Sequence, residues 1–154
     1  MKIRPKINAF TIGEMLVVLI LTSIVVGLAF SVLTLVQKQM RAIQNNFEKN
    51  TELNTLEQSL WIGFHKYSKI EFDKENEILF FTNELDTLQY TFTDGSIIRE
   101  KDTFNVAIEH KTLYFDGDRV QKGYVDAIKL ETTKAFLNKR IFVFSQNDPT
   151  LYFD

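Results

Sequence analysis

The chain has 154 residues, with 18 basic and 20 acidic side chains, no cysteine and 45% hydrophobic content. The absence of cysteine excludes a disulfide scaffold, thiolate catalysis and most structural zinc sites. The formal net charge of −2, without a basic cluster, argues against direct nucleic-acid binding.

A long apolar run lies near the start of the chain. Met15 to Val36 covers 22 residues without an ionisable side chain. At about 1.5 Å per residue, a helix of this length crosses a hydrocarbon core of about 30 Å. Its polar residues are serine and threonine, whose hydroxyls can bond to the helix backbone. The run therefore predicts a membrane-spanning helix.

The charges before this run are asymmetric. Lys2, Arg4 and Lys6 precede it, and no acidic residue comes before Glu14. The positive-inside rule therefore places the N-terminus in the cytoplasm. Glu14 is unusual, because a carboxylate deep in a membrane costs about 2.5–3.5 kcal/mol unless it is paired.

Hydropathy alone leaves two further interpretations of the run open. A secretory signal peptide has an apolar core of about 7–15 residues and a small-residue cleavage site. Here the run is longer, and its end, Thr34 to Gln39, offers no such site. A plain single-pass anchor fits the hydropathy but leaves the Phe10-Thr-Ile-Gly-Glu14 motif unexplained.

The basic leader, the small residue Ala9, the Phe10-Thr-Ile-Gly-Glu14 motif and the apolar run resemble the prepilin signature of type IV pilins and type II secretion pseudopilins. This resemblance implies that prepilin peptidase cuts between Ala9 and Phe10 and methylates the new Phe10 amine. It also implies that Glu14 pairs with the Phe10 amine of a neighbouring subunit and sets the filament register. The sequence departs from the pattern at Ala9, where Gly is commonest, and at Gly13, where Leu or Ile is usual.

From Gln37 the apolar residues become periodic. They recur at intervals of three and four residues, which is the spacing of an amphipathic helix. The spacing predicts that the helix continues over residues 37–68, with a bend near Asn45-Asn46 or Asn50-Thr51. The predicted apolar stripe consists of Val36, Met40, Ile43, Phe47, Leu53, Leu56, Leu60, Phe64 and Tyr67.

Beyond Ser68 the apolar period becomes two, which is typical of strands. The Asp94-Gly95 pair is a hairpin turn signal. We expect an α+β fold in which a long N-terminal helix, half transmembrane and half amphipathic, packs against an antiparallel β-meander. The strands are predicted at residues 69–73, 76–82, 87–93, 96–100, 103–109, 111–115, 124–132 and 139–145.

The predicted organisation has four parts: a leader over 1–9, a transmembrane or filament-core helix over 10–36, its amphipathic continuation over 37–68 and an extracytoplasmic β domain over 69–154. Such an order is similar to that of pilins. The hairpin from Leu88 to Arg99, with Tyr90 and Asp94-Gly95 inside it, resembles that of J-type minor pseudopilins. A minor type IV pilin or a competence pseudopilin remains an alternative.

The resemblance implies a tip or initiation subunit of a type II secretion pseudopilus. Its partners would be prepilin peptidase, other major and minor subunits and the inner membrane. The protein would cross that membrane once and enter a periplasmic or surface filament. A second alternative is a membrane-anchored protein whose β domain binds a ligand.

Few residues suggest other chemistry. Asp116-Gly-Asp118 lacks the further ligands of a calcium loop and favours a hairpin turn. His65 and His110 have no metal-ligand spacing. We therefore expect no catalytic residue, no metal and no cofactor, and we do not expect an enzyme.

Overall fold

The computed structural model describes residues 11–145 and divides into two compact units, which meet between Asn45 and Asn46. One helix, α1, runs from Ile12 to Lys66 and is the predicted long helix. We call residues 12–45 the stalk and residues 46–145 the globular unit. The predicted α+β class, a long helix packed against antiparallel strands, is confirmed.

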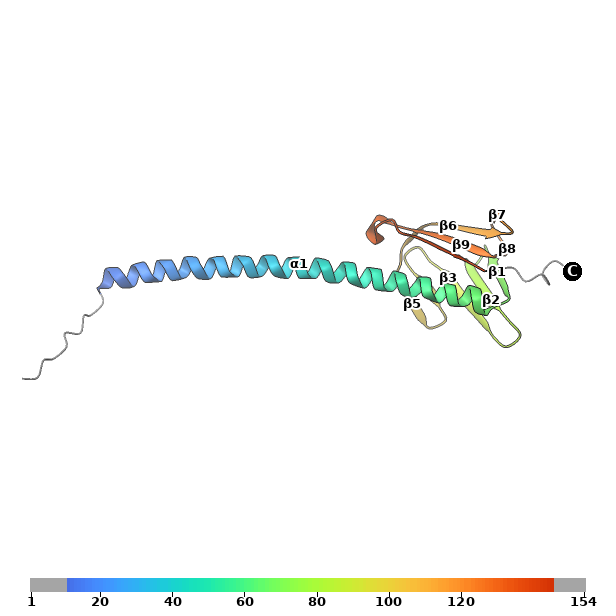
Figure 1. Ribbon diagram of the computed structural model, residues 1–154, viewed down its shortest axis with the longest axis horizontal. Coiled ribbons are helices and arrows are strands. Elements are labelled where there is room, and N and C mark those ends of the chain that lie inside the picture. Colours follow the sequence, from blue (N-terminus) through green and yellow to red (C-terminus); the bar gives the residue numbers. More distant parts are fainter. Residues whose placement is uncertain (1–10, 146–154) are drawn as a thin grey trace, which may run out of the picture. The chain divides into compact units, whose positions relative to one another are not determined.

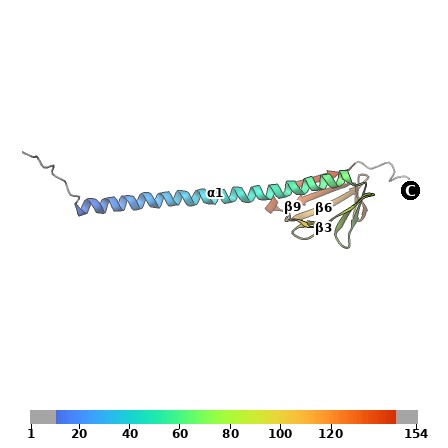
Figure 2. The ribbon, with the colours of Figure 1, turned by 90° about the horizontal axis from the view of Figure 1, so that it is seen from below.

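The strands of the globular unit form two antiparallel sheets (Figures 1 and 2). The six-stranded sheet has the order β5-β4-β3-β2-β1-β8, and the four-stranded sheet has the order β10-β9-β6-β7. The strands of the first sheet are β1 (Lys69–Asp73), β2 (Ile78–Thr82), β3 (Thr87–Phe92), β4 (Ile97–Arg99), β5 (Asp102–Phe104) and β8 (Gly123–Tyr124). Those of the second are β6 (Ile108–Phe115), β7 (Asp118–Val120), β9 (Ala127–Thr132) and β10 (Arg140–Phe144), with the short helix η1 (Lys134–Phe136) before β10.

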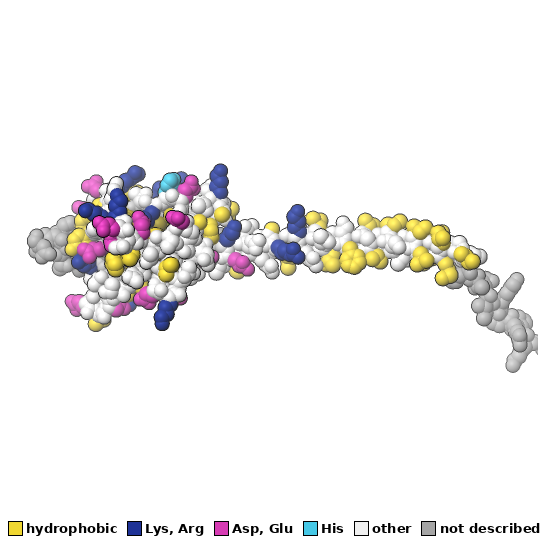
Figure 3. All heavy atoms as spheres, turned by 180° about the vertical axis from the view of Figure 1, so that it is seen from behind, with side chains coloured by type: hydrophobic (Ala, Val, Ile, Leu, Met, Phe, Trp, Pro, Cys, Tyr) yellow, Lys and Arg dark blue, Asp and Glu magenta, His cyan; other side chains and the backbone are white. Residues whose placement is uncertain are grey.

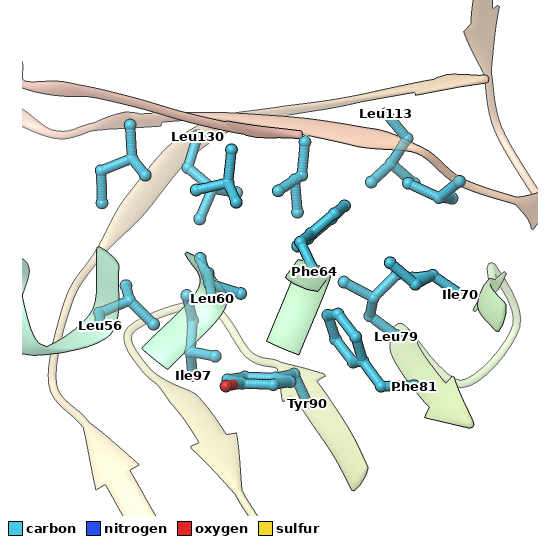
Figure 4. Close-up of a cluster of buried hydrophobic side chains, with 14 of the residues drawn as sticks. Leu56, Leu60, Phe64, Ile70, Leu79, Phe81, Tyr90, Ile97, Leu113 and Leu130 are labelled. Atoms are coloured by element: carbon cyan, nitrogen blue, oxygen red, sulfur yellow. The ribbon is translucent and has the colours of Figure 1, made fainter. Parts of the chain in front are cut away.

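The core of the globular unit lies between the two sheets. Side chains from α1 fill it, with Leu113 and Leu130 on one side and Phe81, Tyr90 and Ile97 on the other (Figure 4). This confirms the second part of the predicted apolar stripe, since all of its members are buried: Leu53, Leu56, Leu60, Phe64 and Tyr67.

Close packing of α1 on β2 depends on Gly63. A Cβ atom at this position would lie 3.1 Å from Cε1 of Phe81, whose side chain is fully buried. The Phe81 ring also makes edge contacts with Phe64, at 5.3 Å between centroids, and with Tyr90, at 5.3 Å. Gly63 therefore lets the helix backbone approach the aromatic centre of the core.

The division into two sheets was not predicted. The expected strand over residues 124–132 is wrong, because the chain changes sheets inside it. The N–H of Val125 donates to Ile70 in the first sheet, at 3.0 Å, whereas the N–H of Asp126 donates to Tyr114 in the second, at 2.9 Å. Val125, Ala127 and Ile128 are all buried, so the alternation is interrupted where the chain changes sheets.

Two other strand predictions were wrong in their boundaries. The expected strands over 103–109 and 111–115 are instead the short β5 and the single long β6. A register shift between Ile108 and His110 interrupts the alternation within β6, which explains the false break. Strand β7 was missed, although the hairpin turn before it was predicted.

The first part of the predicted stripe is exposed. Met40, Ile43 and Phe47 have exposed fractions of 56%, 66% and 71%. Leu53 comes six positions after Phe47, so at about 100° per residue the two side chains lie about 120° apart around the helix. The expected single stripe is therefore two stripes on different helix faces, and the sheets cover only the second.

Candidate functional site

The first turn of α1 contains Glu14, the acidic residue singled out by the sequence. Thr11 is the N-cap, because its carbonyl accepts the first helical bond, from the N–H of Met15 at 3.2 Å. The Glu14 carboxylate accepts from the Thr11 N–H at 2.8 Å and from the Thr11 hydroxyl at 3.1 Å. In return, the Glu14 N–H donates to the Thr11 hydroxyl oxygen at 3.3 Å.

This arrangement is a capping box, in which two otherwise unpaired backbone donors are satisfied reciprocally. Glu14 thus has a partner within its own chain. Sequence reasoning missed this role, although the Thr-x-x-Glu spacing is its signature. The other predicted processing and orientation residues lie outside the described residues; they are Lys2, Arg4, Lys6, Ala9 and Phe10.

The stalk presents apolar side chains on all sides. Every described residue from Thr11 to Asn45 is exposed, and the first charged residue after Glu14 is Lys38 (Figure 3). The hydroxyls of Thr22, Ser23 and Thr34 donate to helix carbonyls four residues earlier, at 2.7–2.8 Å, as the sequence predicts. The helix is long and apolar enough to cross a membrane.

A buried polar network joins α1 to the predicted β3–β4 hairpin. Tyr90 and Arg99 pair across these strands, and both contact Ser59. The Ser59 and Tyr90 hydroxyls lie 2.5 Å apart, and Nη1 of Arg99 donates to Ser59 Oγ at 2.8 Å. Arg99 also pairs with Asp102 at 2.5 Å. Burial raises the pKa of the Tyr90 phenol, partly offset by its hydrogen bonds to Ser59 and Arg99.

A second polar contact joins the two sheets. The Lys111 ammonium on β6 lies 4.2 Å from the ring centroid of Phe72 and 4.3 Å from that of Phe92, both in the other sheet. It forms an ion pair with Glu77, and its side chain is only 16% exposed. Burial lowers the pKa of Lys111, against the opposing effect of Glu77. We call these four side chains the lysine clasp.

The candidate metal residues occupy ordinary structural positions. Asp116 and Gly117 form the two-residue turn between β6 and β7, with φ values of 52° and 85°, which confirms the predicted hairpin. His65 and His110 are exposed, and Nδ1 of His65 lies 2.9 Å from the Trp61 carbonyl. Within residues 11–145, no group of three or more histidine or acidic residues could hold a metal ion.

Comparison of the chain with protein-family models, curated proteins and solved structures found no match.

Proposed function

We propose that this protein is a filament subunit of the prepilin type, processed before Phe10 and assembled through the stalk. Within that class we favour a minor pseudopilin of a type II secretion system over a minor type IV pilin or a competence pseudopilin. The role is structural rather than enzymatic.

The exposure of the stalk is the observation that carries this proposal. The consecutive residues Leu16, Val17, Val18 and Leu19 are turned by about 100° from one to the next, so they point to all sides of α1, and each is at least 54% exposed. A helix that is apolar all round needs lipid or other helices around it. Before assembly the lipid of a membrane can cover the stalk, and after assembly the neighbouring helices of a filament can do so.

The hairpin geometry supports the narrower assignment. The residues that carry the resemblance to J-type subunits, Tyr90 and Arg99, meet at Ser59 and hold the hairpin against α1. The motif therefore has a physical role in joining the helix to its sheet.

Glu14 has two roles in this proposal. In the single chain it caps α1 through Thr11. In the filament it would exchange part of this contact for the amine of Phe10 on a neighbour. An ion pair away from water offsets its desolvation only at close range, so the pair would specify register more than add stability.

The N-terminus of the mature protein tests the proposal. In a host with an active prepilin peptidase, mass spectrometry should find a chain that begins at N-methylated Phe10. The variant Ala9→Trp should keep the leader, because a bulky residue would not fit the site that accepts Ala9. A wild-type chain that retains residues 1–9 in such a host would overturn the proposal.

One observation favours the alternative of an anchored ligand-binding domain. A cleft of about 370 Å³ opens between the sheets beside the lysine clasp, and Lys74 and Arg119 also line it. An unprocessed membrane protein that binds a small anion here would support that alternative.

A further inference from the structure

The lysine clasp has a cleft between the two sheets on either side of it. The first cleft, of about 370 Å³, is bordered by β7, and the second, of about 340 Å³, is bordered by the turn between β3 and β4. Glu77 and Lys111 line both clefts, so their ion pair stands between the two.

The two clefts carry opposite charge. The charged side chains of the first cleft are three cations and one carboxylate, namely Lys74, Lys111, Arg119 and Glu77. In the second cleft Asp94 and Glu109 add to the carboxylate of Glu77, and Lys111 is the single cation. The whole chain has a formal charge of −2, so the positive charge of the first cleft does not follow from overall composition.

Two of the cations of the first cleft lie at its open side. Lys74 and Arg119 are exposed, whereas the Lys111 ammonium is held deeper by Glu77 and two aromatic rings. Nζ of Lys74 donates to Oε1 of Gln121 at 2.6 Å. Because this partner is neutral, the hydrogen bond does not compensate the lysine charge.

Apolar side chains supply the other lining of the first cleft. Phe72 comes from the six-stranded sheet, and Leu113 and Val120 come from the four-stranded sheet. Phe72 and Leu113 are buried, so they form a fixed wall. Sites for small ligands measure about 300–1,000 Å³ and combine apolar walls with a few polar groups, a description that this cleft fits.

We propose that the first cleft binds a small organic anion, with its acidic group at Lys74 and Arg119 and its apolar part against Phe72, Leu113 and Val120. A cleft lined mainly by one sign of charge concentrates ligands of the opposite sign. An extended acidic peptide fits less well, because beyond the Lys111–Glu77 pair it would meet the carboxylates of the second cleft. The site goes beyond the proposed function, since it lies in the globular unit and does not require cleavage before Phe10.

Three fluorinated probes separate the contribution of charge from that of apolar contact. 4-Fluorobenzoate has both a carboxylate and a ring, 4-fluorobenzamidine has the ring with a positive charge, and fluoroacetate has the carboxylate without the ring. Fluorine NMR titrations of the full-length protein in dodecyl maltoside micelles, with empty micelles as background, would measure the dissociation constants. 4-Fluorobenzoate should bind about tenfold more tightly than either other probe, which corresponds to about 1.4 kcal/mol.

Substitutions locate the bound probe. Lys74→Gln and Arg119→Gln should each weaken binding of 4-fluorobenzoate by about fivefold, which corresponds to about 1 kcal/mol. Both side chains are exposed, so neither substitution should disturb folding. Lys122→Gln is the matched control, because Lys122 is an exposed residue between β7 and β8 that does not line the cleft. It should leave the affinity unchanged.

Several results would overturn the proposal. One is the absence of 4-fluorobenzoate binding, and another is equal affinity for 4-fluorobenzoate and either of the other probes. A loss in Lys122→Gln as large as that in Arg119→Gln would also overturn it, because the probe would then respond only to general surface charge. A chain that begins at Phe10 but does not bind the probe would refute this site and leave the proposed function intact.

Discussion

Tyr90 and Arg99 face each other across the β3–β4 hairpin, and both bond to the hydroxyl of Ser59 on α1. Ser59 is only 5% exposed and Tyr90 is fully buried. One small polar residue of the helix thus joins two strands of the six-stranded sheet to the core.

The first prediction is that Ser59→Ala destabilises the globular unit by about 1–3 kcal/mol, because it leaves the buried Tyr90 hydroxyl without its closest partner. Urea unfolding of the full chain in vesicles, followed by Trp61 fluorescence, would measure this. Thr55→Ala is the control, because Thr55 is exposed and bonds only to a carbonyl of its own helix, at 2.8 Å. Equal effects of both substitutions would refute the role of the network.

The second prediction concerns alkaline pH. Burial raises the pKa of Tyr90 above its ordinary value of 10.0. Above about pH 10 the folded state therefore keeps a proton that the unfolded chain loses, so this group lowers stability as the pH rises, by at most about 1.4 kcal/mol per pH unit.

Tyr90→Phe should be less stable than the wild type at pH 7, because it loses a hydrogen bond. This difference should narrow between pH 10 and 11, because phenylalanine cannot ionise. Denaturant titrations of both proteins at several pH values would measure the difference. A stability difference between the wild type and Tyr90→Phe that stays constant over this pH range would contradict the prediction.

The third prediction separates the two roles of Glu14. Thr11→Ala removes the capping hydroxyl but keeps the Glu14 carboxylate. It should destabilise the first turn of α1 by about 0.5–2 kcal/mol. Glu14→Val or Glu14→Ala removes the charge. Both types of variant should insert into the membrane, but only the Glu14 variants should fail to enter the filament.

Copurification of tagged variants with sheared filaments would measure this incorporation. If Thr11→Ala lowered incorporation as much as Glu14→Val, capping alone would explain the need for Glu14. Normal incorporation of Glu14→Val would eliminate the register role.

The fourth prediction concerns the lysine clasp. Glu77→Gln should destabilise the globular unit by about 1.5–3 kcal/mol, because the poorly exposed Lys111 ammonium loses its charged partner. Lys111→Met should be nearly neutral or stabilising, because a charge that is costly to bury is replaced by an apolar chain among the same two rings. Thermal unfolding at pH 7 would compare the stabilities of the two variants. A larger loss of stability in Lys111→Met than in Glu77→Gln would contradict this account.

Local signals in the sequence predicted much of the fold. The burial of Leu53 to Tyr67 follows from helical periodicity, and the turns at Asp94-Gly95 and Asp116-Gly117 follow from residue type. The change of sheet at Val125 was not predictable, because it depends on distant partners in β1 and β6.

The candidate site was predicted less completely. The apolar stalk was predicted from hydropathy, and Glu14 was singled out by its charge. The contact between Glu14 and Thr11 is local but was not predicted, because the resemblance to prepilins implies a partner for Glu14 outside the chain. The clasp of Lys111 with Phe72 and Phe92 joins residues far apart in sequence, so no spacing rule could find it.

The rotation of about 120° between Phe47 and Leu53 makes the length of the segment between them important. Point substitutions at residues 48–52 leave this angular offset intact. Deleting one residue there would turn Phe47 by about 100° relative to Leu53 and the covered face. A substitution in this segment changes one side chain, whereas a change in its residue count would alter the direction in which the exposed Phe47 points.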